Sequence, residues 1–220
     1  MQSHAVQNIL FDLDGTLIDS SPGILAAYAE ALRRERIEPL VPLAPKLIGP
    51  PMRTTVAQLV GSDDDAIIDR VALAFKHAYD TEGYRATRAY PGVGLSLRSL
   101  VDNGCRLYIL TNKREAPTLS IVAMFGWSRL FAGVFALDSL SPAAPDKAAL
   151  VKFVLQKHEL SPEVTALVGD TPADAVAASV NGLRFVGVSW GYGSFSEPRF
   201  AGLPVLRDPA NLLLCARTDA

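Results

Sequence analysis

The stretch "ILFDLDGTLIDS", Ile9 to Ser20, joins an apolar segment directly to two carboxylates that are separated by one residue. The residues from Val6 to Phe11 have the apolar content of a buried β-strand, and Asp12 and Asp14 follow where that strand ends. Crowded carboxylates repel each other, so this placement costs stability unless the pair does chemistry or binds a cation. The pair therefore marks a candidate functional site at the end of the first strand.

Composition sets broad limits on the class of protein. The chain has 220 residues, of which 49% are apolar, enough for one large domain or one domain with an insertion. A formal net charge of −2 gives no reason to expect a nucleic-acid or membrane partner. Cys105 and Cys215 are too few for a disulfide framework. Residues 1–8 show no basic segment followed by an apolar one, so we expect a cytoplasmic protein.

Short apolar segments recur along the chain, and amphipathic helical patterns lie between them. Such an alternation is typical of parallel βαβ units, so it predicts an α/β fold with a Rossmann-like parallel sheet. Besides the first strand, the expected strands are residues 106–110, 133–137, 165–168 and 184–188.

The alternation fails once, between the first and second strands. Almost a hundred residues intervene there, and most of them show helical apolar stripes. We therefore expect residues 19–87 to form an inserted all-helical cap domain, with residues 1–18 and 88–220 forming the α/β core domain. The turn "YPG" at residues 90–92 marks the return of the chain to the core.

Polar residues follow each expected strand, where ligands bind in parallel α/β sheets. The fold would bring these groups to one edge of the sheet, although they lie far apart in the sequence. Clustered carboxylates of this kind need a hard cation, and Mg²⁺ fits best. The residues are Asp12, Asp14, Thr111, Asn112, Lys147, Asp170 and Asp174.

The motifs "DLDGT", "LTN", "DK" and "GDTPAD" occur in that order, and together they resemble the haloacid dehalogenase-like superfamily. The resemblance covers essentially the whole chain. The position of the helical insertion, together with "IGPPM" at residues 48–52 and "WGYG" at residues 190–193, is similar to the phosphoglycolate phosphatase-like branch. The resemblance implies a phosphatase with an α/β core, a helical cap and Mg²⁺ as cofactor.

The chemistry of the groups suggests a role for each. Asp12 is expected to attack phosphorus and form an aspartyl phosphate, and Asp14 to act as general acid and then general base. Lys147, with Thr111 and Asn112, would stabilise the phosphoryl charge. Mg²⁺ would be held by the residues that the family pattern implies, namely Asp12, Asp170 and the main-chain carbonyl of Asp14.

Two further residues are candidates for roles in this scheme. Asp174 can be a metal ligand, or it can cap a helix and orient Asp170. Arg53 follows the turn "GPPM" in the expected cap, and its guanidinium could pair with an anionic group of the substrate. Because the core motifs handle any phosphoryl group, we expect the cap to select the leaving group.

The sequence thus favours a Mg²⁺-dependent phosphatase that acts on a small soluble phosphomonoester. Phosphoglycolate, a nucleoside monophosphate and a sugar phosphate all remain open as substrates, and the oligomeric state is open as well. A phosphomutase of the same superfamily and a non-catalytic phosphate- or metal-binding protein are the alternatives. A dehalogenase is disfavoured by Asp14 and Asp170, because it needs no metal and typically lacks the second Asp of the first motif.

Overall fold

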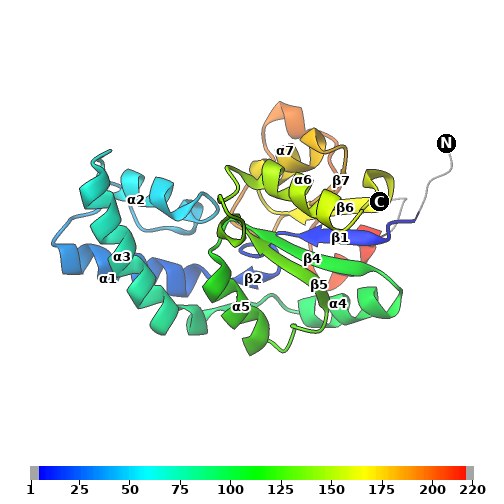
Figure 1. Cartoon of the computed structure of the whole chain (residues 1–220), viewed down its shortest axis with the longest axis horizontal. Coiled ribbons are helices and arrows are strands. Elements are labelled where there is room, and N and C mark those ends of the chain that lie inside the picture. The colour runs from blue at the N-terminus through cyan, green and yellow to red at the C-terminus, as the bar shows by residue number, and fades with distance from the viewer. Residues whose placement is uncertain (1–4, 217–220) are drawn as a thin grey trace.

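The computed structural model describes residues 5–216 and contains a six-stranded parallel sheet. The strand order is β5-β4-β1-β6-β7-β8, which places the first strand in the interior of the sheet (Figure 1). The predicted α/β fold is therefore confirmed. The strands are β1 Asn8–Phe11, β4 Arg106–Thr111, β5 Phe131–Ala136, β6 Thr165–Gly169, β7 Arg184–Val188 and β8 Val205–Leu206.

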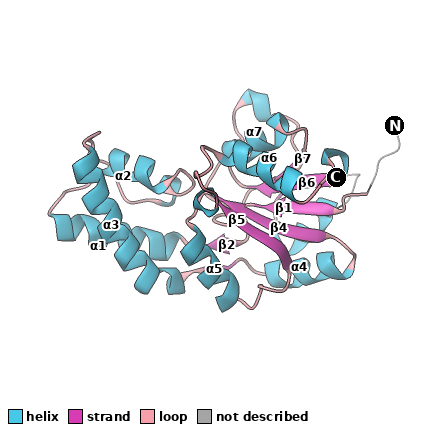
Figure 2. Cartoon of the chain, in the orientation of Figure 1, coloured by secondary structure: helices cyan, strands magenta, loops and turns pink. Residues whose placement is uncertain are grey.

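Helices cover both faces of the sheet, as Figure 2 shows. Successive side chains of a strand point to opposite faces, so Ile9 and Phe11 pack into one apolar cluster and Leu10 into another. The first cluster includes residues of α4, α5 and η6, and the second includes residues of α6 and α7. These helices are α4 Val93–Asp102, α5 Glu115–Met124, α6 Lys147–Lys157, α7 Pro172–Val180 and the 3₁₀ helix η6 Pro209–Ala216.

The segment between β1 and β4 is mainly helical and has an apolar cluster of its own. Its helices lie beyond the carboxyl end of the sheet, at the left of Figure 1. We propose that this cluster is the core of the separate cap domain expected at residues 19–87. The helices are α1 Ser21–Glu35, α2 Met52–Val60 and α3 Asp65–Thr81, with the short turns η1 Pro45–Leu47 and η2 Gly83–Ala86.

A two-stranded antiparallel ribbon lies where the chain enters and leaves the helical segment. It pairs β2, Ile18–Asp19, with β3, Arg88–Ala89. Neither this ribbon nor β8 was expected, because two residues are too short to show an apolar period. The remaining 3₁₀ turns are η3 Leu137–Ser139, η4 Pro162–Val164 and η5 Pro198–Phe200.

The strand order changes direction at β1, which has β4 on one side and β6 on the other. In open parallel sheets, a crevice forms at such a point, outside the carboxyl ends of the strands. The end of β1 is therefore the place where a site is expected. Within residues 5–216, no helix combines the length and the apolar content that crossing a membrane would require.

Candidate active site

A buried ammonium lies between two carboxylates at the end of β1. Lys147, the first residue of α6, donates hydrogen bonds to Oδ1 of Asp12 over 2.6 Å and to Oδ1 of Asp174 over 2.5 Å. All three side chains are buried. Burial alone would lower the pKa of Lys147, but the adjacent Asp12 and Asp174 raise it above its usual value. The side chain is therefore held as a cation against the predicted nucleophile.

Asp12, Asp170 and Asp174 form a compact group of carboxylates. One oxygen from each lies within 4.8 Å of the others. Burial raises the pKa of Asp12 well above its usual range despite the opposing charge of Lys147. Burial, and then the charge of Asp174, raise the pKa of Asp170 to about 6. Oxygen donors with an excess of negative charge are the chemistry that Mg²⁺ prefers, so the group fits this cation.

Asp170 is held in place by the loop that follows β7. Its Oδ2 accepts hydrogen bonds from the main-chain nitrogens of Tyr192 over 2.8 Å and Gly193 over 3.3 Å. A Cβ on Gly191 would lie 2.4 Å from Oδ2 of Asp170 and from the carbonyl oxygen of Gly15. Only glycine therefore allows this loop to approach so closely, which gives the "WGYG" stretch a physical role beside the carboxylates.

The aromatic side chains of the same loop contact the first motif and the start of the helical segment. Trp190 Nε1 donates to the carbonyl oxygen of Thr16 over 3.0 Å. The hydroxyl of Tyr192 accepts hydrogen bonds from the main-chain nitrogens of Ser20 and Ser21 over 2.9 and 3.1 Å. Both aromatic side chains therefore contact the segment just after Asp14, at Thr16 and at the start of α1.

The carboxylate of Asp14 has different partners from the Asp12 group. It accepts hydrogen bonds from Nζ of Lys113 over 3.1 and 3.2 Å and from the hydroxyl of Ser20. The main chain of Asp14 forms a bridge with Ile18, so the residue lies in the tight turn after β1. The two aspartates of the first motif are thus held by separate cations, Asp12 by Lys147 and Asp14 by Lys113.

Lys113 follows β4, and its sequence position left both a surface place and a place in the site open. Its side chain is 6% exposed, and its ammonium lies 4.4 Å from the centre of the Tyr79 ring in α3. Burial opposes its charge, but the neighbouring Asp14 raises the pKa of Lys113 above the usual value. The residue follows "LTN" directly, and this adjacency to a strand end is the signal that could have identified it.

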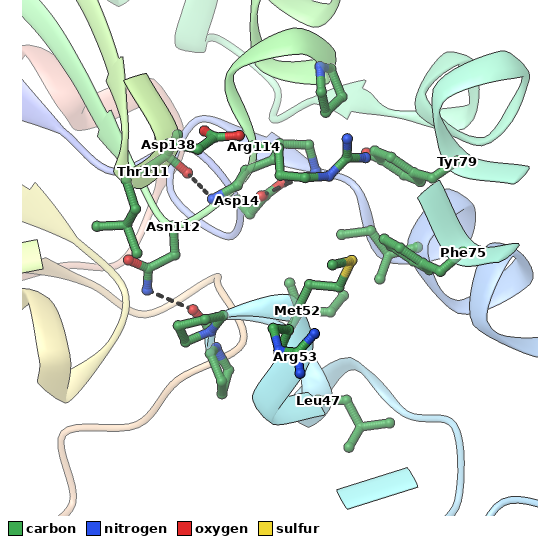
Figure 3. A pocket seen from close by; sticks show the side chains of 18 of the residues that line it. Asp14, Leu47, Met52, Arg53, Phe75, Tyr79, Thr111, Asn112, Arg114 and Asp138 are labelled. Atoms are coloured by element: carbon green, nitrogen blue, oxygen red, sulfur yellow. Dashed lines mark hydrogen bonds and ion pairs between the residues drawn. The ribbon is translucent and has the colours of Figure 1, made fainter. Parts of the chain in front are cut away.

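Thr111 and Asn112 lie at the end of β4, as predicted. Oγ1 of Thr111 accepts a hydrogen bond from the main-chain nitrogen of Lys113 over 3.1 Å, so its own proton remains free to be donated. Asn112 Nδ2 donates to the carbonyl oxygen of Gly49 over 2.8 Å. Figure 3 shows this bond as a dashed line, which connects the core to the loop before α2.

Arg53 lies in α2 and lines the cavity, but its guanidinium contacts other protein groups. Nη2 bonds to Asp65 over 2.5 Å, and Nη1 bonds to Asp69. Both acids belong to α3, and the Arg53 side chain is 50% exposed. Its predicted contact with an anionic substrate stays a prediction.

A cavity of about 400 Å³ extends from the aspartates of the first motif to the helices of the insertion (Figure 3). Core residues line one side of it and residues of α1, η1, α2 and α3 line the other. The predicted residues Asp12, Asp14, Thr111, Asn112 and Arg53 are all among those that line it. The arrangement therefore brings the predicted nucleophile, the predicted proton donor and the predicted phosphoryl-binding residues to one cavity.

The two histidines within residues 5–216 do not line this cavity. His77 is exposed on α3, and the ring of His158 packs at 5.0 Å from Tyr108 and 5.5 Å from Phe135. His4 lies outside the described residues. His158 is therefore half-buried against the sheet, whereas His77 lies on the surface.

Comparison with known proteins gives the family. The model of the haloacid dehalogenase-like hydrolase family matches residues 9–188. The chain is 32% identical to a 5'-nucleotidase of Pseudomonas aeruginosa over 193 residues, which cover 87% of this chain and 86% of that protein. It is 33% identical to a phosphoglycolate phosphatase of Nitrosospira multiformis over 194 residues, which cover 85% of each protein.

The fold has a close match among solved structures. The crystal structure of a predicted phosphoglycolate phosphatase from Haemophilus somnus superimposes with a TM-score of 0.85 at 25% identity, and the match covers 96% of this chain and 98% of that one. The predicted superfamily, branch and enzyme class are confirmed. This chain belongs to the haloacid dehalogenase-like hydrolase family, as an enzyme of its phosphoglycolate phosphatase-like branch.

Proposed function

We propose that this enzyme is a Mg²⁺-dependent phosphatase that hydrolyses a small soluble phosphomonoester through an aspartyl phosphate on Asp12. One observation carries the proposal. The carboxylate of Asp12 is buried beside the ammonium of Lys147 and two further carboxylates, at one end of a cavity that also contains Asp14. A protein that only binds phosphate has no use for a buried nucleophile and a separate acid–base group.

The metal site is proposed from the donors that are present. Mg²⁺ would be held by the carboxylates of Asp12 and Asp170 and by the main-chain carbonyl of Asp14. When bound, it would neutralise these carboxylates and attract the phosphoryl oxygens. Asp174 already accepts bonds from Lys147 and from the main-chain nitrogen and hydroxyl of Thr171, so we assign it to positioning Lys147.

In the first half-reaction, a carboxylate oxygen of Asp12 attacks the phosphorus atom. The bond from phosphorus to the leaving oxygen breaks, and Asp14 gives that oxygen a proton. Lys147 offsets the charge of the phosphoryl group, and the free hydroxyl proton of Thr111 can be donated to one of its oxygens. Asn112 has one N–H left after its bond to Gly49, and this group can bind another phosphoryl oxygen.

In the second half-reaction, the carboxylate of Asp14 takes a proton from a water molecule. The water oxygen attacks the phosphorus of the aspartyl phosphate, and the bond to Asp12 breaks. Inorganic phosphate leaves, Asp12 is regenerated as a carboxylate, and Asp14 is protonated again for the next cycle. One residue thus serves as acid and as base, which is the role suggested by its place two residues after the nucleophile.

The test is hydrolysis by the purified protein with Mg²⁺, measured as phosphate release from p-nitrophenyl phosphate and a panel of metabolite phosphomonoesters. We expect turnover that is abolished by chelation and by Asp12→Asn. Conversion of a sugar phosphate to its isomer without phosphate release would indicate a phosphomutase. Binding of inorganic phosphate without turnover of any ester would indicate a binding protein, and either result would overturn the proposal.

A further inference from the structure

Resting on the proposed phosphatase function, we propose that the substrate's leaving group is an uncharged, ring-bearing alcohol about the size of a nucleoside. A small carboxylate such as glycolate fits the cavity poorly. The inference rests on three features of the cavity: its volume, the apolar surface on its cap side and the pairing of its cations.

The volume exceeds what a small leaving group can fill. The cavity of about 400 Å³ reaches from Asp12 and Asp14 to the helices of the insertion. This volume is within the range of about 300–1,000 Å³ that is typical of sites that enclose a drug-sized ligand. A phosphoryl group at Asp12 with a two-carbon leaving group would leave most of the cap side to water.

The cap side of the cavity is apolar and partly aromatic. Tyr28 stacks on Phe75 with 4.2 Å between ring centres, and Phe75 stacks on Tyr79 at 5.6 Å. Met52 is half-buried at the start of α2, and its side chain points toward the cavity in Figure 3. Ile24, with Leu47, Ile48, Pro50 and Pro51, adds further apolar surface. A ring that covers this surface gains free energy, whereas a carboxylate placed there loses its hydration.

The cations that line the cavity are already paired. Within the described chain they are Arg53, Lys113 and Arg114. Lys113 bonds to both oxygens of Asp14. Arg114 bonds to both oxygens of Asp80 in α3.

Arg53 was the predicted partner for an anionic substrate group, and its charge is offset as well. It bonds to Asp65 and Asp69, so two carboxylates surround one guanidinium. A carboxylate on the leaving group would compete with these acids for each cation, so it would gain less there than beside an unpaired cation. The charge pattern therefore disfavours a second anionic group and admits a neutral one.

The first experiment compares leaving groups on the wild-type enzyme with Mg²⁺. We expect kcat/KM for 2-phenylethyl phosphate or uridine 5'-monophosphate to exceed that for phosphoglycolate by at least about tenfold, the scale of differences made by small apolar contacts in a pocket. A value for phosphoglycolate equal to or above both would overturn the inference and leave the phosphatase proposal intact. Absence of hydrolysis with all of these and with p-nitrophenyl phosphate would overturn both.

The second experiment changes the charge of the cap side at Met52. Met52→Arg adds a cation without an acidic partner, so we expect the ratio of kcat/KM for phosphoglycolate to that for 2-phenylethyl phosphate to rise about tenfold. Met52→Ala is the matched control, and it should weaken the ring-bearing substrate without improving phosphoglycolate. An unchanged ratio in Met52→Arg would overturn the inference.

Binding gives a readout that does not depend on turnover. In the Asp12→Asn background, which cannot form the phosphoenzyme, calorimetry should give a lower Kd for 2-phenylethyl phosphate than for phosphoglycolate. Met52→Arg in the same background should reverse this order, and circular dichroism should show that each variant is folded. A lower Kd for phosphoglycolate than for 2-phenylethyl phosphate in the Asp12→Asn variant alone would overturn the inference.

Discussion

The ammonium of Lys113 lies 3.1 and 3.2 Å from the two carboxylate oxygens of Asp14, and the Tyr79 ring covers it at 4.4 Å. The two charged residues are 99 positions apart in the sequence, and both side chains are buried. This contact joins the proposed acid–base residue to the end of β4 and to α3 of the insertion. The orientation of Asp14 therefore depends on Lys113.

Replacing Lys113 should impair the enzyme through Asp14. Lys113→Met keeps the apolar stem and removes the charge, so the Asp14 carboxylate loses two charge-assisted hydrogen bonds. We expect kcat/KM to fall by about 10- to 100-fold, which corresponds to roughly 1.5–3 kcal/mol for a hydrogen bond to a charged group. Steady-state kinetics with p-nitrophenyl phosphate would measure this loss.

A double-mutant cycle separates positioning from a direct role. If Lys113 acts through Asp14, then Lys113→Met should cost little more in an Asp14→Asn background. Additive losses would show that Lys113 contacts the substrate itself. Lys152→Met, at an exposed position of α6, is the matched control for the loss of one lysine charge and should leave kcat/KM unchanged.

The two aspartates of the first motif should differ in the step that they block. Asp12→Asn removes the nucleophile and should leave only background hydrolysis. Asp14→Asn keeps the nucleophile but loses proton transfer, which contributes roughly 10²- to 10⁴-fold. With a good leaving group such as p-nitrophenolate, Asp14→Asn should accumulate phosphoenzyme, and mass spectrometry should find the phosphate on Asp12. Near-normal turnover by Asp12→Asn would eliminate this mechanism.

Much of the fold could be predicted because the relevant signals are local. The apolar run before Asp12 and the similar runs that follow it give the parallel sheet, and the helical stripes between them give the insertion. The motif residues at strand ends meet because parallel strands share one carboxyl edge. Asp12 and Lys147 therefore come together, as was expected from their positions relative to the strands.

The missed features depend on how distant elements pack. A lysine after a strand usually lies in solvent, whereas Lys113 is covered by the Tyr79 ring of α3 and pairs with Asp14. The pairing of Arg53 with Asp65 and Asp69 depends on the approach of α2 to α3, which no sequence period specifies. For Asp174, the two alternatives were a metal ligand and a residue that caps a helix or orients Asp170. Its Oδ2 does cap α7, because it accepts a hydrogen bond from the main-chain nitrogen of Thr171. Its bond to Lys147 is a contact that neither alternative included.

The metal-free protein should lose stability as pH rises through the range in which Asp170 ionises. Burial and the charge of Asp174 raise the pKa of Asp170 to about 6, above its ordinary value near 3.8. Between these values the native state binds more protons than the unfolded state, so the free energy of unfolding falls as pH rises. The total effect is on the order of 3 kcal/mol. Urea unfolding in excess chelator, from pH 4 to pH 7, would measure it.

Asp170→Asn is the control for this pH dependence, because other carboxylates contribute slopes of their own. We expect the stability of the wild type relative to Asp170→Asn to decrease with rising pH in chelator. Saturating Mg²⁺ should remove that decrease, since a bound cation favours the ionised carboxylates. A wild-type protein that gains stability over Asp170→Asn across this range without metal would contradict the raised pKa.

The ion pair between Arg114 and Asp80 should hold the helical segment against the core. Arg114 lies at the start of α5, and both of its terminal nitrogens bond to the carboxylate of Asp80 near the end of α3. The two side chains are 22% and 34% exposed, so the pair is partly screened from water. Asp80→Ala removes the pair. We expect the helical segment then to open away from the α/β core, so that substrate binds more weakly. We expect KM to rise roughly fivefold, equivalent to about 1 kcal/mol, with a smaller change in kcat.

Exchanging the charges of Arg114 and Asp80 tests whether the ion pair between them causes the change in KM. Arg114→Asp alone places two acids together and should raise KM further than Asp80→Ala does. The double variant Arg114→Asp with Asp80→Arg rebuilds the pair in reverse and should recover most of the lost affinity. Raising the salt concentration should narrow the difference between wild type and Asp80→Ala, because the contact is partly exposed. If the reversed pair is folded by circular dichroism and recovers nothing, Arg114 acts on the substrate in the cavity that it lines, and the ion pair does not hold the two parts together.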